Sequence, residues 1–269
     1  MSPLSGELAA AGSAVLFGVA SAMQHAEVRS VARRGSLDAR LLYDLARRST
    51  WWVSLLADGG AVLLQALALH GASVAFVQGL LVLGLPISVL LTTRRGMLRH
   101  RPLLGTTLAT VGIAAFAAAQ PETHPVPAST RGLLLPVAVV AVASLYARRA
   151  PTVLVAAAAG VVTGAASALL AAAAAYPLTT VLTRPAAWLA AVAGLLALQL
   201  SQSALRGKNP GASLAALTLT EPVTAVALAA LVLHQHPALT VAAVVGAVVG
   251  AVGVVVLESD ARSTTTDEA

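Results

Sequence analysis

The sequence predicts an all-α polytopic membrane protein with about nine transmembrane helices in an inverted repeat. Three observations lead to this prediction. First, 58% of the 269 residues are apolar and only 10% are charged, whereas soluble domains carry about 25% charged residues. Second, the apolar residues form stretches long enough to cross the roughly 30 Å hydrocarbon core of a bilayer. Third, the second half of the chain resembles the first.

Nine apolar stretches are candidates for membrane-spanning helices. The first follows a segment that contains Glu7 and no Lys or Arg before Leu8, and so lacks the basic start of a cleavable signal peptide. We therefore expect it to remain as the first helix. The nine expected helices cover residues 6–24, 50–70, 73–93, 103–119, 132–147, 152–176, 186–205, 211–233 and 238–257.

Basic residues alternate between rich and poor connecting segments. The odd-numbered loops and the tail hold 15 Lys and Arg, whereas the N-terminus and the even-numbered loops hold only Arg131 and Arg184. Because cytoplasmic loops are enriched in Lys and Arg, the alternation predicts a cytoplasmic-membrane protein with its N-terminus outside and its C-terminus in the cytoplasm. Aromatic residues at expected helix ends, where interfacial rings belong, agree: Trp51, Trp52, Tyr146, Tyr176 and Trp188.

The internal repeat appears when the chain is shifted by 136 residues. Trp52 then meets Trp188, and Pro86 meets Pro222 in the same ungapped register. At a shift of 146, Gly18-Val-Ala-Ser-Ala meets Gly164-Ala-Ala-Ser-Ala. The first four helices thus correspond to the last four, and the single helix between them forces the second copy to enter the membrane in the opposite sense.

This organisation predicts one transmembrane domain over residues 1–269. Repeat one covers about 6–119, a linking helix about 132–147, repeat two about 152–257, and a cytoplasmic tail 258–269. Inverted repeats build many secondary transporters, with the substrate site near the membrane midplane where the repeats meet.

The arrangement resembles the drug/metabolite transporter superfamily, whose members are built from inverted repeats of short helices. The stretch from Leu219 to Leu228, with Glu221-Pro222-Val223, is similar to the Glu-Pro-Val motif of its penultimate helix, and Leu16-Phe17-Gly18 to its opening helix. The resemblance is to EamA-like members. It implies transport of a small solute or metabolite.

Two features depart from the usual members of that superfamily. Nine helices are expected here instead of ten, and the Glu that commonly follows the penultimate helix is replaced by the stretch 234–236, His-Gln-His. Nine helices, the long basic first loop and the block 64–80 look more like the NIPA-type, magnesium-transporter-like branch. That resemblance implies Mg²⁺ as an alternative substrate.

Asp58 and Glu221 are the acidic residues near the middle of expected helices, the second and the eighth. Ionisable groups at membrane depth cost a few kcal/mol and usually mark ion or substrate pathways. Either acid could couple a proton or bind a cation. The alternative is that each is a protonated contact between helices with no role in transport.

Other polar and helix-breaking residues complete the candidate site. Proline removes a backbone hydrogen bond inside a helix, so Pro86 and Pro222 could each shape a midplane site or merely kink a helix. Neutral polar side chains could contact a solute or instead join helices: Gln65, Gln78, Gln199, Gln202 and Thr218, with Thr220 nearby.

Several weaker features were weighed and assigned no function. Gln24, His25 and Glu27 close the first helix at its cytoplasmic end and could gate or bind, but a helix end beside six arginines is more often only solvated. The histidines His234 and His236, with Glu122 and His124, could collect a metal ion on the outer face, but dedicated sites need three or four converging ligands, so the sequence leaves open whether a metal binds. A helix-packing face of small residues is expected at Gly246, Gly250 and Gly253.

The sequence also excludes classes of function. It contains no Cys, and no phosphate-binding glycine loop, zinc-protease motif or nucleophile elbow. The net charge of +6 is spread over the loops and forms no nucleic-acid patch. We therefore expect no enzyme activity, no cofactor and no nucleic-acid partner; the expected partners are the lipid bilayer, a small-molecule or ion substrate and, as one option, a second copy in a homodimer.

The leading hypothesis is a secondary transporter that moves a small polar solute by alternating access. A NIPA-like Mg²⁺ transporter is the second, and a non-transporting membrane scaffold the third. The substrate, the direction of transport and the coupling ion are left open by the sequence. The three hypotheses differ in whether Asp58 and Glu221 share one site or pack separately against neighbouring helices.

Overall fold

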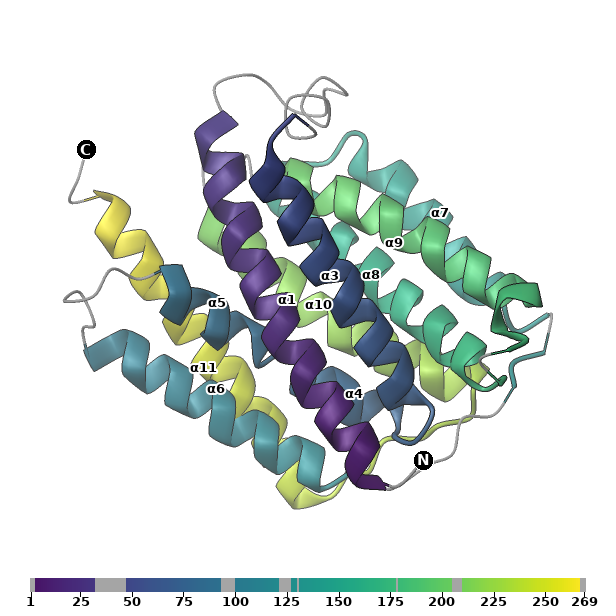
Figure 1. Cartoon of the computed structure of the whole chain (residues 1–269). Helices are drawn as coiled ribbons and strands as arrows, with labels where there is room; N and C mark the ends of the chain where they lie inside the picture. Colours follow the sequence, from purple (N-terminus) through teal and green to yellow (C-terminus); the bar gives the residue numbers. More distant parts are fainter. Residues whose placement is uncertain are drawn as a thin grey trace.

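The described residues form an all-helical bundle. The computed structural model describes residues 3–31, 47–92, 100–120, 127–129, 131–177, 179–204 and 210–266, and no strand occurs within them. The helices are α1 (Pro3–Val31), α3 (Ser49–Leu69), α4 (Val74–Leu81), α5 (Gly84–Thr92), α6 (His100–Ala118), α7 (Leu134–Ala147), α8 (Thr152–Ala174), η1 (Val181–Thr183), α9 (Pro185–Ala204), α10 (Pro210–Val232) and α11 (Val241–Thr266). The start of α1 and the end of α11 lie at opposite ends of the bundle (Figure 1).

The third expected helix, 73–93, is wrong as a single element, because the chain breaks it into α4 and α5. Pro86 has no N–H to donate to the carbonyl of Val82. That carbonyl instead accepts from Leu85 N at 3.1 Å, and Leu83 N donates to Leu80 O at 3.0 Å. The two short-range bonds make a turn at Val82 and Leu83 where helical bonds would otherwise continue.

The matching proline behaves differently, since Pro222 lies inside the continuous helix α10. The hydroxyl of Thr220, two residues earlier, lies 2.8 Å from Ala216 O and 3.1 Å from Ala157 O of α8, and its one proton is shared between these two acceptors. Gly84 occupies the equivalent place before Pro86 and has no hydroxyl. Gly weakens a helix more than Thr does, and only Thr220 can tie its helix to a neighbour, which agrees with a break near Pro86 and a continuous helix at Pro222.

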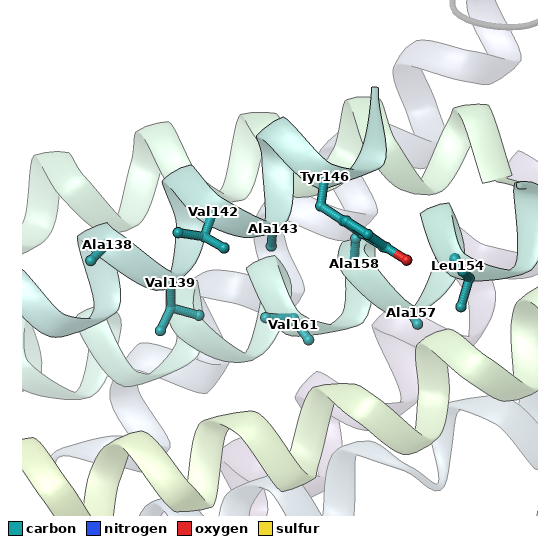
Figure 2. A pocket seen from close by; sticks show the side chains of 9 residues that line it. All are labelled: Ala138, Val139, Val142, Ala143, Tyr146, Leu154, Ala157, Ala158 and Val161. Atoms are coloured by element: carbon teal, nitrogen blue, oxygen red, sulfur yellow. The ribbon is translucent and has the colours of Figure 1, made fainter. Parts of the chain in front are cut away.

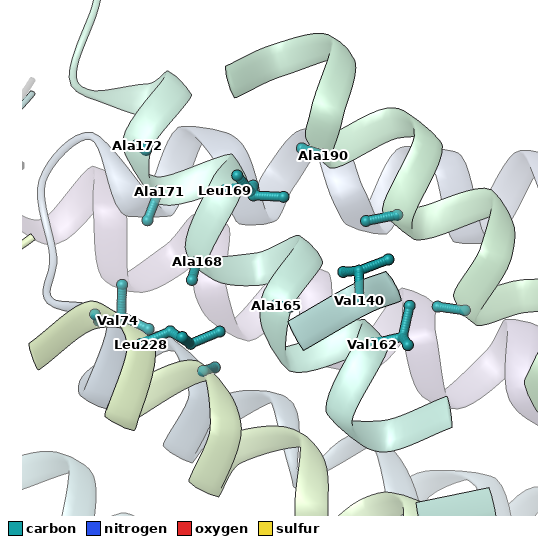
Figure 3. Close-up of a cluster of buried hydrophobic side chains, with 14 of the residues drawn as sticks. Val74, Val140, Val162, Ala165, Ala168, Leu169, Ala171, Ala172, Ala190 and Leu228 are labelled. Atoms are coloured by element: carbon teal, nitrogen blue, oxygen red, sulfur yellow. The ribbon is translucent and has the colours of Figure 1, made fainter. Parts of the chain in front are cut away.

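Helix α8 is the centre of the core. Most of its length is buried, and its residues are mainly Ala, Gly and Val. Figure 3 shows the surrounding side chains, including Val74 of α4, Val140 of α7, Ala190 of α9 and Leu228 of α10, which belong to the same buried cluster. Small residues let helix backbones approach closely, and in lipid such close packing supplies much of the stabilisation between helices.

A second close crossing joins α6 to α11. A Cβ added at Gly112 of α6 would lie 2.6 Å from Gly246 O and 2.7 Å from Gly250 Cα, and one added at Gly253 would lie 2.7 Å from Ala109 Cα. No L side chain fits at such distances. The expected packing face at Gly246, Gly250 and Gly253 is therefore confirmed, and α6 is its partner.

Gly253→Ala is expected to destabilise the bundle, because the added methyl overlaps the α6 backbone at Ala109. Overpacking of this kind typically costs about 1–3 kcal/mol. The control is Gly194→Ala in α9, where a Cβ meets nothing within 4 Å, and where Ala gains up to about 1 kcal/mol of helix propensity. The melting temperature of the detergent-solubilised protein should fall for Gly253→Ala and hold or rise for Gly194→Ala. Equal melting temperatures would contradict the close crossing.

The outer surface of the bundle is strongly apolar. Leu56 is 75% exposed, Leu195 68% and Leu231 66%, and large apolar patches mark contact with a partner or a membrane. Within the described residues, four segments are long and apolar enough to cross a bilayer: Gly6–Gln24, Ser49–Leu69, Thr152–Ala174 and Pro185–Ala204. Shorter apolar helices occur at Val74–Ser88, Thr107–Ala118, Leu134–Ala147, Ala216–Val232 and Val241–Val256. The molecule is thus an all-α bundle with several helices that could span a membrane.

Candidate functional site

Asp58 and Glu221 lie within electrostatic range of each other in the folded chain. Asp58 lies near the middle of α3 and Glu221 near the middle of α10. Each side chain is half-buried, and the charge of Asp58 acts on Glu221. The two acids named from the sequence therefore form one electrostatic site, although more than 160 residues of chain separate them.

Gln24 of α1 completes the contacts of Asp58. Its side chain donates a hydrogen bond to the Asp58 carboxylate, and its Oε1 accepts from Gln202 Nε2 of α9 at 2.9 Å. The result is a continuous polar network, Gln202 to Gln24 to Asp58, with Glu221 beside it. Four helices, α1, α3, α9 and α10, contribute one side chain each.

Gln202 is the innermost member of this network. It is 1% exposed, and its Oε1 has no hydrogen-bond partner within the described residues. A buried polar atom without a partner costs about 1–3 kcal/mol. The network is therefore not a fully satisfied contact between helices, and it ends in a buried acceptor.

Gln65 makes a separate contact two turns along α3. It is 3% exposed, and its Nε2 donates to Ser167 Oγ of α8 at 3.1 Å. This contact joins α3 to the central helix. It matches the structural alternative considered for the glutamines, a hydrogen bond that holds two helices together.

The other sequence candidates lie in different surroundings. Gln78 of α4 is 2% exposed, and its Nε2 lacks a partner among the described residues. Gln199 of α9, three residues before the buried Gln202, is exposed. Thr218 is half-buried on α10, one turn before Pro222, whose ring nitrogen cannot donate to its carbonyl.

Backbone approach at Glu221 is unusually close. A Cβ at Gly160 of α8 would meet the Thr220 hydroxyl and lie 3.1 Å from Glu221 N, and one at Gly164 would meet the Glu221 carbonyl and lie 2.8 Å from Thr224 Cβ. Two glycines one turn apart thus fix α8 against the turn of α10 that carries the acid. Pro222 lies in that same turn, so α8 packs most closely against α10 where a backbone hydrogen bond is missing.

The loop after α10 contains the 234–236 stretch and makes two polar contacts with distant parts of the chain. Gln235 Oε1 accepts from Val74 N at 3.1 Å, and Gln120 Oε1 accepts from Ala238 N at 3.1 Å. His234 adopts a φ of 54° and, like His236, is exposed, while Glu122 and His124 lie outside the described residues. Within the described residues no three His, Asp or Glu side chains gather as a metal site.

A groove of about 480 Å³ lies elsewhere, between α7 and α8. Figure 2 shows its lining, which is apolar apart from the Tyr146 hydroxyl: Ala138, Val139, Val142, Ala143, Tyr146, Leu154, Ala157, Ala158 and Val161. Such a lining offers no partner to a polar solute. The candidate site is therefore the four-helix network, and this groove is not part of it.

Comparison with known proteins finds no match to a protein-family model, to a curated protein or to a solved structure.

Proposed function

We propose that the protein is a secondary transporter of the cytoplasmic membrane that moves a small polar solute by alternating access. The observation that carries the proposal is the polar network around Asp58 and Glu221. It lies among helices with strongly apolar surfaces, and the buried acceptor Gln202 Oε1 has no hydrogen-bond partner in the part of the chain that the structure describes. Charged groups at membrane depth are expensive, so selection for binding is the simplest reason to keep two of them together.

An inverted repeat of helices 1–4 and 6–9 is part of the proposal. Its support is that matched positions make similar contacts. A Cβ added at Gly18 of α1 would lie 2.8 Å from Gly84 O and from Ile87 Cβ, and one added at its sequence counterpart Gly164 of α8 would lie 2.8 Å from Thr224 Cβ. Each contact joins the first helix of a proposed repeat to the proline-containing segment of the same repeat.

The network also lies where such repeats would meet. Gln24 and Asp58 belong to the proposed first repeat, and Gln202 and Glu221 to the second. A rocking motion of one repeat against the other would therefore change distances inside the site. The alternating basic loops support an orientation with the N-terminus outside, which places the Gln24 and Gln202 ends of their helices toward the cytoplasm.

The two alternatives are less well supported. Mg²⁺ requires near-octahedral oxygen coordination, whereas the network offers two carboxylates and one free amide oxygen. In a non-transporting scaffold, we expect the polar groups of the network to be fully hydrogen-bonded to neighbouring helices. The unpartnered Gln202 Oε1 is the observation that disfavours it.

Water access to the site tests the proposal without knowledge of the substrate. The natural chain contains no Cys, so Thr218→Cys introduces a unique thiol one turn from Glu221. We expect it to react with a membrane-impermeant thiol reagent, because a transport site must open to water. The control Ala165→Cys, at a position with 0% exposure, should stay unlabelled in intact membranes. An unreactive thiol at residue 218 from both sides of the membrane would overturn the transport proposal in favour of a scaffold.

A further inference from the structure

We propose that the groove between α7 and α8 holds one anionic phospholipid, with an acyl chain along the groove and the phosphate group on Arg148 and Arg149. The proposal goes beyond the proposed function and does not depend on it, because a scaffold in the same membrane could bind the lipid equally well. It follows from the shape and lining of the groove and from the charges at one of its ends.

The groove is long and narrow. Its lining comes from residues 138–146 of α7 and 154–161 of α8, and at 1.5 Å per residue it runs for about 12 Å along α7. Its volume of about 480 Å³ then corresponds to a mean cross-section of about 40 Å², about half of the roughly 80 Å² that a helix 10 Å wide occupies. A helix of a second copy could place only side chains there, whereas an extended hydrocarbon chain can lie along the whole length.

The groove opens onto an apolar surface of the bundle. Val142, which lines it, is 67% exposed, and Leu145 on the same helix is 61% exposed. Large apolar surfaces of this kind mark contact with a membrane or a partner, and space left empty against an apolar lining forfeits dispersion contacts. In a bilayer the hydrocarbon available to fill such a groove is a lipid tail.

One end of the groove is positively charged. Tyr146 and Leu154 line that end, and the turn between them carries Arg148 and Arg149. The turn is held by two short-range bonds, from Arg148 N to Leu145 O at 3.3 Å and from Arg149 N to Tyr146 O at 3.2 Å. Both arginine side chains are exposed, and neither forms an ion pair or a hydrogen bond with any other described residue. Two guanidinium groups therefore lie within three residues of the groove.

The adjoining helices supply no carboxylate to neutralise these groups. The sequence contains no Asp or Glu between Glu122 and Glu221, so α7, α8 and α9 carry none. Guanidinium groups form paired, charge-assisted hydrogen bonds with phosphate, and basic residues beside a membrane attract anionic headgroups. In the proposed orientation this end of the groove faces the cytoplasm, the side on which the leaflet surface is negative.

Tyr146 joins the apolar and charged parts of the site. Figure 2 shows its ring extending from α7 across α8, with the hydroxyl toward Leu154. Tyrosine rings lie at membrane interfaces, where the hydroxyl can donate a further hydrogen bond to a headgroup. A hydrocarbon tail joined to an anionic phosphate is the chemistry that matches an apolar groove with this end.

Native mass spectrometry of the delipidated full-length protein measures the headgroup preference. Phosphatidylglycerol and phosphatidylcholine of equal chain length are titrated separately, and we expect the first molecule of phosphatidylglycerol to bind roughly tenfold or more tightly. Arg148→Gln combined with Arg149→Gln should remove most of this preference. The matched control, Arg131→Gln with Arg184→Gln, removes the same charge at two exposed positions outside the turn and should leave it unchanged.

A second pair of variants tests the groove itself. Ala143→Leu places three more carbon atoms in the lining and should weaken both lipids alike, with the preference for phosphatidylglycerol retained. Ala141→Leu, at an exposed position of α7 outside the lining, should change neither affinity. Because the two arginines are exposed, their substitution tests the proposal independently of any packing effect of the leucine.

Three results would overturn the proposal. The first is equal affinity for the two lipids, and the second is a preference that survives the loss of both Arg148 and Arg149 or is lost equally in the control pair. The third is lipid binding that Ala143→Leu leaves unchanged. A dimer in the mass spectrum that Ala143→Leu abolishes at every lipid concentration would instead identify a second copy as the occupant of the groove.

Discussion

Glu221→Gln is expected to reduce transport by roughly 10- to 100-fold while leaving the protein in the membrane at normal abundance. The amide keeps the shape of the side chain and its ability to hydrogen-bond, but it neither titrates nor carries charge. A hydrogen bond to a charged partner contributes about 1.5–3 kcal/mol, and each 1.4 kcal/mol is a factor of ten. The side chain of Glu221 interacts electrostatically with Asp58, on a helix that α8 approaches closely, so the substitution removes one of the two titratable groups of the site.

Charge displacement by proteoliposomes on a supported membrane measures this effect. Amino acids, sugars, organic cations and Mg²⁺ are perfused in turn, and the largest saturable current of the unmodified protein is compared with that of the variant. Glu7→Gln makes the same chemical change at an exposed acid near the start of α1 and should leave the current unchanged. A Glu221→Gln current equal to that of the unmodified protein would leave Glu221 as a buried polar contact.

Stability gives a second signature of the same residue. A carboxylate at the bilayer centre costs about 2.5–3.5 kcal/mol on insertion scales. The neutral variant should therefore insert at least as well as the native chain. Loss of current with retained or improved insertion separates a functional acid from a structural one, because removal of a structural contact would lower abundance and transport together.

Helix positions could be predicted from the sequence because hydrophobicity alone determines them. Each of the nine apolar stretches contains a helix in the described structure, and most ends agree within a few residues. The break between α4 and α5 was missed. Apolar runs do not reveal which carbonyls a proline leaves without a donor, and Pro222 in α10 shows that the same residue can be accommodated.

The candidate site was predicted only in part. Asp58 and Glu221 were identifiable because acids are rare at membrane depth. Gln24 was interpreted as a solvated helix end, yet its side chain links Asp58 to Gln202. Neither the spacing nor the repeat could show this, since the residue one repeat length from Asp58 is Gly194 and the counterpart of Glu221 is Leu85. The site is asymmetric within a symmetric sequence pattern, so only the packing of four distant helices reveals it.

If the protein transports by the proposed mechanism, a cross-link between α4 and the loop after α10, the outer side in the proposed orientation, should stop transport completely and reversibly. The N-terminus of α4 and the loop after α10 meet there, with Gln235 Oε1 accepting from Val74 N at 3.1 Å. Ala75 and His236 line the same small space between them, with room for about 10 Å³. In the proposed arrangement α4 belongs to the first repeat and His236 to the second. Alternating access requires this contact to open, so a covalent link across it should hold the protein closed to the outside.

Because the sequence contains no Cys, a thiol reagent can react only with the two cysteines that are introduced. Ala75→Cys with His236→Cys is treated with a short bifunctional thiol reagent that is cleaved by reductant, and uptake by proteoliposomes is measured before and after reduction. We expect uptake to fall to the level of empty liposomes and to recover on reduction. The matched control joins Leu182→Cys to Trp188→Cys, two exposed positions of one repeat that are already linked by a 2.8 Å hydrogen bond from Trp188 Nε1 to Leu182 O. Because that link lies within one proposed repeat, it should leave uptake unchanged. Undiminished uptake by the fully cross-linked 75–236 pair would show that the contact between α4 and the loop after α10 does not open during transport.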